Sequence, residues 1–249
     1  MLIAFLWSLV DPAYPWSYQH LWPQSLSFHH WIRIFTGTNI VTAIGNSFMI
    51  AGITIITTAV LSLPTAYALG RRKIKGKETF KILMLFPMMF PGMAMALFMG
   101  RLIFTWGFSS TYTGVIMAHT LIAIPFMLRI LTVSFEVMPQ ELIDAAQNLG
   151  ANRWTTLWEI YVPMILPGIT AGAIFAFVTS MEEFVMTFII GAPRIITIPT
   201  ILFSYLGFNF MRTGASVVSL ILVIPNVVLL LVTERFIKTE YMGAALGKM

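Results

Sequence analysis

The chain contains no cysteine and carries few charged residues for its length. Without cysteine it can form no disulfide, no thiolate metal site and no cysteine nucleophile. Charged residues make up 10% of the 249 residues, whereas a soluble domain carries about 25%. Hydrophobic residues make up 58%, and the mean hydropathy is +0.85. This composition argues against an ordinary soluble domain and indicates an integral membrane protein.

Several functional motifs are also missing from the sequence. It has no G-x-x-x-x-G-K-[ST] phosphate loop, so the chain itself is not expected to bind ATP. No Ser/His/Asp set has a spacing typical of catalysis, and no resident metal or cofactor is expected. The net charge of +5 is modest and clustered, which does not indicate nucleic-acid binding. The N-terminus lacks a basic n-region and an A-x-A-like site, so no cleavable signal peptide is expected.

Long apolar runs dominate what is present. A spanning helix needs about 20 mainly apolar residues, and five segments meet this length: Ile40–Leu69, Ile82–Phe104, Thr113–Phe135, Met164–Ile190 and Thr213–Thr233. The opening MLIAFLWSLV covers about 15 Å as a helix, which is half a bilayer. It is either part of a truncated first span or an interfacial stub. The sequence therefore predicts an all-α, polytopic transmembrane bundle, with residues 1–249 forming a single domain.

Basic residues set the expected orientation. Six of them crowd the short loop RRKIKGKETFK, from Arg71 to Lys81, which the positive-inside rule places in the cytoplasm. Alternation then puts residues 136–162 and 234–249 inside, and residues 106–112 and 192–212 outside. Ten of the fifteen Lys and Arg residues are cytoplasmic in this topology. The aromatic segment 11–39 is expected along the outer membrane interface.

One cytoplasmic segment is unusually polar: DAAQNLGANRWTTLWEIYVP, from Asp144 to Pro163. Pro139 and Glu141 suit the first turn of a short helix, which Gly150 would end in a left-handed conformation. Asn152 can cap a second short helix that runs to about Trp158. Two readings stay open on local physics alone: a surface that docks another protein, or an amphipathic connector lying on lipid head groups.

The spacing within this segment resembles a family motif. D-A-A, three residues, Gly, nine residues, I-x-V-P is similar to the EAA loop of binding-protein-dependent ATP-binding-cassette (ABC) importers, whose pattern is E-A-A, three residues, Gly, nine residues, I-x-L-P. The sequence departs from it conservatively, with Asp144 for Glu and Val162 for Leu. The resemblance implies that the loop 139–163 couples the chain to an ATPase. The residues expected to do so are Glu141, Asp144, Ala145, Ala146, Gly150, Ala151, Ile160 and Pro163.

The resemblance also implies a fold, a set of partners and a location. The chain would be a type I importer permease, a non-catalytic subunit in the bacterial inner membrane. Its partners would be two ATPase subunits that bind the ATP, a second homologous permease, an external solute-binding protein and membrane lipid. An alternative from another class is a membrane enzyme or scaffold whose polar loop docks an assembly partner.

Two adjacent carboxylates, Glu182 and Glu183, lie within the fourth apolar run. A charge inside the bilayer is costly, so such residues usually face a cavity or a partner. They are expected to line the substrate pathway together with Arg101, or to form an ion pair with Arg101. A neighbouring pair resembles the polyamine (spermidine/putrescine) permeases, which implies a small cationic solute. Importers of ferric ion, phosphonates or opines remain alternatives.

Other polar residues have structural explanations. Gly168 and Gly172 form a G-x-x-x-G pattern that favours close helix packing. His119 is expected to be a packed, hydrogen-bonded histidine, and Arg129 to extend toward the membrane surface. His20, His29 and His30 lie in the outer segment, where they are weak evidence for a metal.

Overall fold

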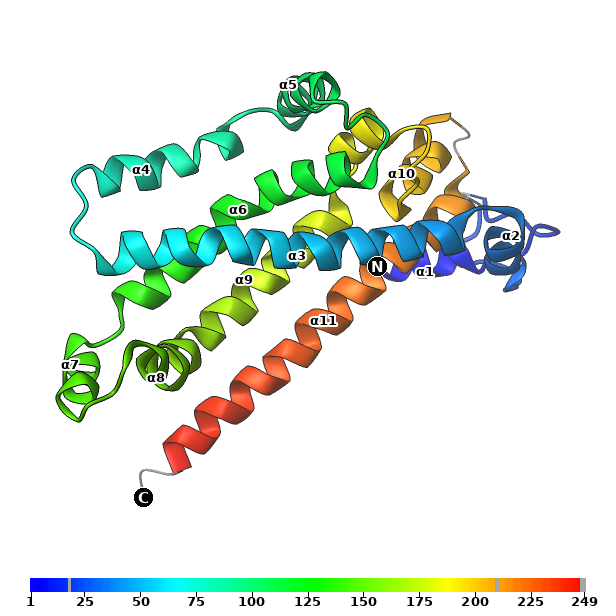
Figure 1. The fold of residues 1–249 in the computed structure, drawn as a ribbon. Helices are drawn as coiled ribbons and strands as arrows, with labels where there is room; N and C mark the ends of the chain where they lie inside the picture. Colours follow the sequence, from blue (N-terminus) through cyan, green and yellow to red (C-terminus); the bar gives the residue numbers. More distant parts are fainter. Residues whose placement is uncertain (18, 209–210, 247–249) are drawn as a thin grey trace.

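The computed structural model describes residues 1–17, 19–208 and 211–246, and these form a helical bundle (Figure 1). Within them the only extended pairing is an isolated bridge between Val10 and Leu26. The helices are α1 (Leu2–Ser8), α2 (His29–Gly37), α3 (Ile40–Arg71), α4 (Lys77–Met84), η1 (Phe86–Met89), α5 (Gly92–Thr105), α6 (Tyr112–Glu136), α7 (Gln140–Asn148), α8 (Arg153–Thr156), η2 (Leu157–Tyr161), α9 (Val162–Glu182), η3 (Thr187–Gly191), α10 (Ile198–Phe203), η4 (Ser204–Phe208) and α11 (Arg212–Leu246).

Four helical stretches are long and apolar enough to cross a membrane: Ile40–Arg71, Tyr112–Glu136, Arg153–Glu182 and Arg212–Thr233. The predicted all-α membrane fold is confirmed, and three of the predicted spans keep their expected starts or ends within a few residues. α3, α6 and α9 pack against one another at the centre, and α1 and α10 pack against α11. α7 and α8 lie at one end of the bundle, and α2 and α10 lie at the other (Figure 1).

The predicted second span, Ile82–Phe104, is not one helix. α4 ends at Met84, a single 3₁₀ turn follows, and α5 starts only at Gly92. Pro87 and Pro91 explain the break, since each lacks the N–H that a continuous helix would use. Pro91 also has extended backbone angles, with φ −56° and ψ 132°. α5 alone is too short to be counted among the four spanning stretches.

The predicted fourth span, Met164–Ile190, was also too long. α9 ends at Glu182, where Glu183 turns the backbone with ψ 110°. Residues 185–191 then form a second short helical segment, mostly a π-helical turn. The fourth apolar run is therefore a long helix, a break at residues 183–184 and a short second helical segment.

Small residues permit the close packing of α9 on α6. A methyl group at Gly168 would collide with the Ser134 hydroxyl, and one at Gly172 would lie 3.0 Å from Met127 Cγ. Around this contact, buried residues of α3, α6, α7, α9 and the loop between α6 and α7 form one apolar cluster: Ala66, Leu69, Ala123, Met127, Leu128, Leu131, Phe135, Met138, Ile143, Ile165 and Ala176. The expected packing role of G-x-x-x-G is confirmed.

Candidate functional site

The polar segment begins within α7, which enters the apolar core of the bundle through one buried side chain. α7 has Glu141 in its first turn, as predicted, whereas Pro139 is the N-cap before the helix and not part of its first turn. Ile143 is only 2% exposed and joins the apolar cluster described above. The other residues of α7 are exposed apart from Ala146, which is half-buried. One face of α7 is therefore fixed to the bundle, while the opposite face is open.

Arg71 holds the backbone that leads into α7. Its Nη1 donates to the Met138 carbonyl at 2.8 Å, and its Nη2 donates to Gln140 Oε1. Gln140 Nε2 in turn donates to Asp144 Oδ1 at 2.8 Å. The sequence marked Arg71 only as part of a basic loop, because nothing local shows that the end of α3 meets residue 138. These contacts confirm that the loop Arg71–Lys81 and the polar segment share one end of the bundle.

Gly150 ends α7 with a positive φ of 86°, as predicted. The Ala151 N–H donates to the Ala146 carbonyl at 2.9 Å, and the Gly150 N–H donates to the Gln147 carbonyl at 3.0 Å. This pair of bonds is the Schellman motif, which satisfies the last carbonyls of a helix. A Cβ at Gly150 would meet nothing within 4 Å, so the space above the turn is open.

Asn152 caps α8, as predicted, by accepting from the Trp154 and Thr155 N–H groups at 2.9 Å each. The second helix does not stop near Trp158, however. η2 is a π-helical turn that carries the chain directly from α8 into α9. α8 and α9 therefore share one continuous helical backbone over Arg153–Glu182.

The open side of this segment combines small and large apolar residues, and we name it the α7–α8 surface. Leu149 is 90% exposed, Trp154 is 70% exposed and Leu142 is 49% exposed, around the small residues Ala145 and Gly150. Of the other residues predicted here, Glu141, Asp144 and Pro163 are exposed, and Ala146, Ala151 and Ile160 are half-buried. Exposed large apolar groups of this kind are typical of surfaces that contact another protein or a membrane.

The acidic pair sits at the break after α9, and its two members have different surroundings. Glu183 Oε1 accepts the Met186 N–H at 2.8 Å, so this carboxylate caps the following helical segment. Glu182 is exposed, and its Oε1 lies 3.5 Å from Asn226 Nδ2 of α11. The pair therefore does not act as two equivalent carboxylates.

Arg101 is not brought to the acidic pair. It is exposed on α5, and every ion pair in the described part of the chain joins Lys77 or Lys81 to Glu78 or Glu136. The predicted alternative of an ion pair between Arg101 and Glu182 or Glu183 is therefore wrong. Position along the sequence placed these residues at similar depth, but it could not place them on facing sides.

His119 spans the same break from α6. It is buried, and its Nδ1 and Nε2 each lie 2.8 Å from a hydroxyl, Ser180 Oγ before the break and Thr187 Oγ1 after it. The expected packed and hydrogen-bonded histidine is confirmed. Its partners were not foreseen, because serine and threonine hydroxyls give no distinctive signal in an apolar run.

Residues 62–239 match the family described as the binding-protein-dependent transport system inner membrane component. The chain belongs to this family. It is accordingly a multi-pass inner-membrane permease subunit of a binding-protein-dependent ABC importer. This membership favours the transport reading of the polar loop over an enzyme or scaffold of another class.

The relatives of this permease are named for different transported solutes. It is 26% identical over 255 residues to the trehalose/maltose transport system permease protein MalG of Thermococcus litoralis, covering 98% of this chain and 91% of the relative. It is 25% identical over 210 residues to the molybdenum transport system permease protein ModB of Haemophilus influenzae, covering 78% and 92%. A chain from the crystal structure of a bacterial alginate importer aligns with TM-score 0.73 at 18% identity, covering 94% of this chain and 88% of that one. The last comparison confirms the importer permease fold.

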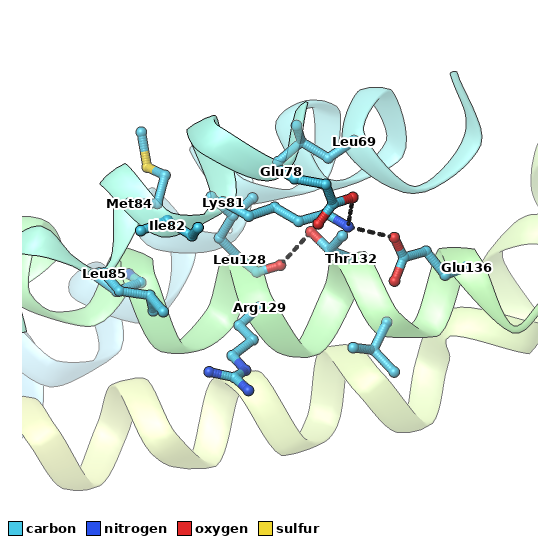
Figure 2. A pocket seen from close by; sticks show the side chains of 12 residues that line it. Leu69, Glu78, Lys81, Ile82, Met84, Leu85, Leu128, Arg129, Thr132 and Glu136 are labelled. Carbon is cyan, nitrogen blue, oxygen red and sulfur yellow. Dashed lines mark hydrogen bonds and ion pairs between the residues drawn. The ribbon is translucent and has the colours of Figure 1, made fainter. Parts of the chain in front are cut away.

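The permease also carries a charged cluster where α4 meets the end of α6 (Figure 2). Lys81 Nζ lies 2.7 Å from Glu136 Oε1 and 3.0 Å from Glu78 Oε1. Hydrogen bonds to Glu136 and then to Glu78 raise the pKa of Lys81 above its ordinary value. Among the described residues, no three His, Asp or Glu side chains lie close enough together to hold a metal ion.

Proposed function

We propose that this permease forms one wall of a solute pathway and receives the force of ATP binding through the α7–α8 surface. The observation that carries the proposal is the exposure of Leu149 and Trp154 beside the positive-φ turn at Gly150. A partner groove can approach this bare turn closely, while the two large side chains fill pockets in the partner. Asp144, Ala145 and Ala146 would lie along the same contact.

The coupling route follows from the contacts on either side of that surface. Arg71 links the start of α7 to α3, and η2 links α8 to α9. A partner that moves the α7–α8 surface would therefore move two spanning helices together. On this proposal residues 1–249 act as one domain, ATP is bound and hydrolysed by the partner, and the chain is not itself an enzyme.

The proposed assembly contains a second homologous permease, two ATPase subunits and an external solute-binding protein. One solved neighbour, with TM-score 0.67, is titled an alginate ABC transporter in complex with an alginate-bound periplasmic protein, which supports this kind of partner. A single bundle of this size would enclose a pathway poorly. The exposed side of Glu182 would then face the pathway or the sister subunit.

For the cargo, we propose a small solute rich in hydrogen-bond donors. An exposed carboxylate beside Asn226 accepts such bonds and repels anions, so a sugar-like solute and a polyamine both fit. Support for a polyamine comes only from the acidic pair, and Glu183 is already engaged as a helix cap. The relatives reported above are named for trehalose/maltose and molybdenum and do not add to it. Ferric ion, phosphonates and opines have no observation in their favour.

The experiment that tests the proposal is purification of the tagged chain in mild detergent, with mass spectrometry of everything that accompanies it. We expect an ATPase with a phosphate loop, a sister permease and a binding protein, whose ligand can then be found by thermal-shift screening. Recovery of a folded chain with none of these would contradict the proposal and return the α7–α8 surface to a lipid-lying connector.

A further inference from the structure

A cavity of about 250 Å³ lies between α3, α4 and α6, near the cytoplasmic end of the bundle (Figure 2). Its walls are mainly apolar, with Leu69 from α3, Ile82 and Leu85 from the α4 side, and Leu128 and Val133 from α6. The Lys81–Glu136 ion pair stands at its cytoplasmic side. The cavity therefore has an apolar interior and charged residues along its cytoplasmic edge.

Both carboxylates at this edge already have partners. Glu136 Oε1 lies 2.7 Å from Lys81 Nζ and 3.9 Å from Lys77 Nζ, and Glu78 Oε1 lies 3.0 Å from Lys81 Nζ. Arg129 also lines the cavity, and its side chain lies apart from these carboxylates (Figure 2). It takes part in no ion pair within the described part of the chain. With three cations and two carboxylates, the five charged groups sum to +1.

The depth of Arg129 limits what can pair with it. It precedes Glu136 by seven residues, or about 10 Å along α6. α6 has 25 residues and is about 37 Å long, which exceeds the hydrocarbon thickness of about 30 Å by a few Å at each end. The Arg129 backbone therefore lies below the inner membrane surface, within reach of the headgroup layer for an extended arginine side chain. An arginine at this depth is stabilised by an anion, by backbone carbonyls or by contact with the headgroup layer.

We propose that this cavity binds an anionic phospholipid of the inner leaflet, with the phosphate on Arg129 and an acyl chain along the apolar wall. Guanidinium groups bind phosphate oxygens through two parallel hydrogen bonds. Basic pockets between spanning helices on the cytoplasmic side are a known arrangement for anionic headgroups. The basic loop Arg71–Lys81 beside the cavity adds to the attraction.

The test uses the whole importer, purified in mild detergent after incubation with vesicles of equal parts phosphatidylglycerol and phosphatidylcholine. Retained lipids are counted by mass spectrometry. We expect wild type to retain phosphatidylglycerol selectively and R129Q to retain about tenfold less, from the loss of a charge-assisted bond. R101Q is the matched control, since Arg101 is also exposed and outside every described ion pair, and it should retain the wild-type amount. L85W, which fills the cavity, should also lose the lipid.

Three results would overturn the proposal. Undiminished phosphatidylglycerol retention in R129Q would show that Arg129 does not bind the phosphate. Equal retention of phosphatidylcholine would show that the site does not select anionic lipids. Loss in R129Q but full retention in L85W would show a bound headgroup or free phosphate without an acyl-chain site. If R129Q fails to assemble, a photoactivatable phosphatidylglycerol on the wild-type importer still decides: crosslinks must fall in residues 77–85 or 125–136, and crosslinks elsewhere would contradict the site.

Discussion

Arg71 Nη1 lies 2.8 Å from the carbonyl oxygen of Met138, so the last residue of α3 is bonded to the backbone just before α7. Because the acceptor is a main-chain carbonyl, this bond holds the backbone itself and does not depend on the side chain at position 138. Arg71, nearly seventy positions earlier in the chain, therefore holds the α7–α8 surface against the bundle together with the buried Ile143.

Arg71→Gln should loosen this connection. The lost bonds involve a charged donor and are worth about 1.5–3 kcal/mol, so we expect roughly tenfold weaker stimulation of ATP hydrolysis by the loaded binding protein. Amount in the membrane should not change. The measurement is ATPase activity of the reconstituted importer with and without binding protein. Arg72→Gln is the control, since Arg72 lies over the Tyr67 ring rather than on α7; equal loss in both variants would contradict a specific role.

Gly150→Val should prevent docking of the ATPase without preventing insertion. A β-branched residue at φ 86° is strained, by about 1–2 kcal/mol, and it covers the bare turn. We expect loss of ATPase co-purification at wild-type permease yield. Gly76→Val is matched, because Gly76 also has a positive φ of 79° and open space around it. If the Gly76 variant loses the ATPase as well, backbone strain rather than docking explains the result.

The two carboxylates after α9 should give different phenotypes. Glu183→Ala removes a helix cap and should cost about 1 kcal/mol of stability, seen as a lower melting temperature of the detergent-solubilised permease. Glu182→Gln should leave the melting temperature unchanged and raise the KM for uptake in reconstituted vesicles. Unaltered uptake kinetics in Glu182→Gln would rule out its place in the pathway.

His119→Leu should weaken the junction between α9 and residues 185–191. Two hydrogen bonds are lost and the buried Ser180 hydroxyl is left without its partner, whereas Thr187 keeps its bond to the Glu183 carbonyl, at a total cost of about 2–4 kcal/mol. Thermal unfolding of the purified permease measures the loss. Ser180→Ala removes one bond only and should lie between wild type and His119→Leu; an effect as large as that of His119→Leu would mean that the histidine is not the shared element.

The long helices could be predicted because lipid exposure makes hydropathy an almost direct readout of spans. α3 and α6 appear where the apolar runs lie, and Pro64 and Pro125 do not interrupt them. The break in the second span, at Pro87 and Pro91, was not predicted. Proline spacing alone does not reveal it, because Pro163 and Pro167 are also four residues apart and lie within a continuous helical stretch.

The local structure of the α7–α8 surface was predicted best, since Gly150 and Asn152 act through local backbone chemistry. The acidic pair was predicted less well. The sequence is apolar on both sides of the pair, so its hydropathy predicts one helix that continues through Glu183. Only the hydrogen bond to Met186 shows that Glu183 lies between two helical segments. Likewise, no local pattern could show that Arg71 reaches Met138 or that His119 reaches two hydroxyls.

The interrupted second crossing has a mechanical consequence. α4 is fastened to α6 by Lys81 and Glu136, whereas α5 packs with Met186 and Ile190 beyond the break in α9. Because η1 interrupts the helix between them, α4 and α5 are less rigidly connected than two halves of one continuous helix. On the proposed function, we expect force applied at the cytoplasmic face to bend the chain at η1 before it moves α5. One side of the wall would then open while the other stays closed, as an alternating pathway requires.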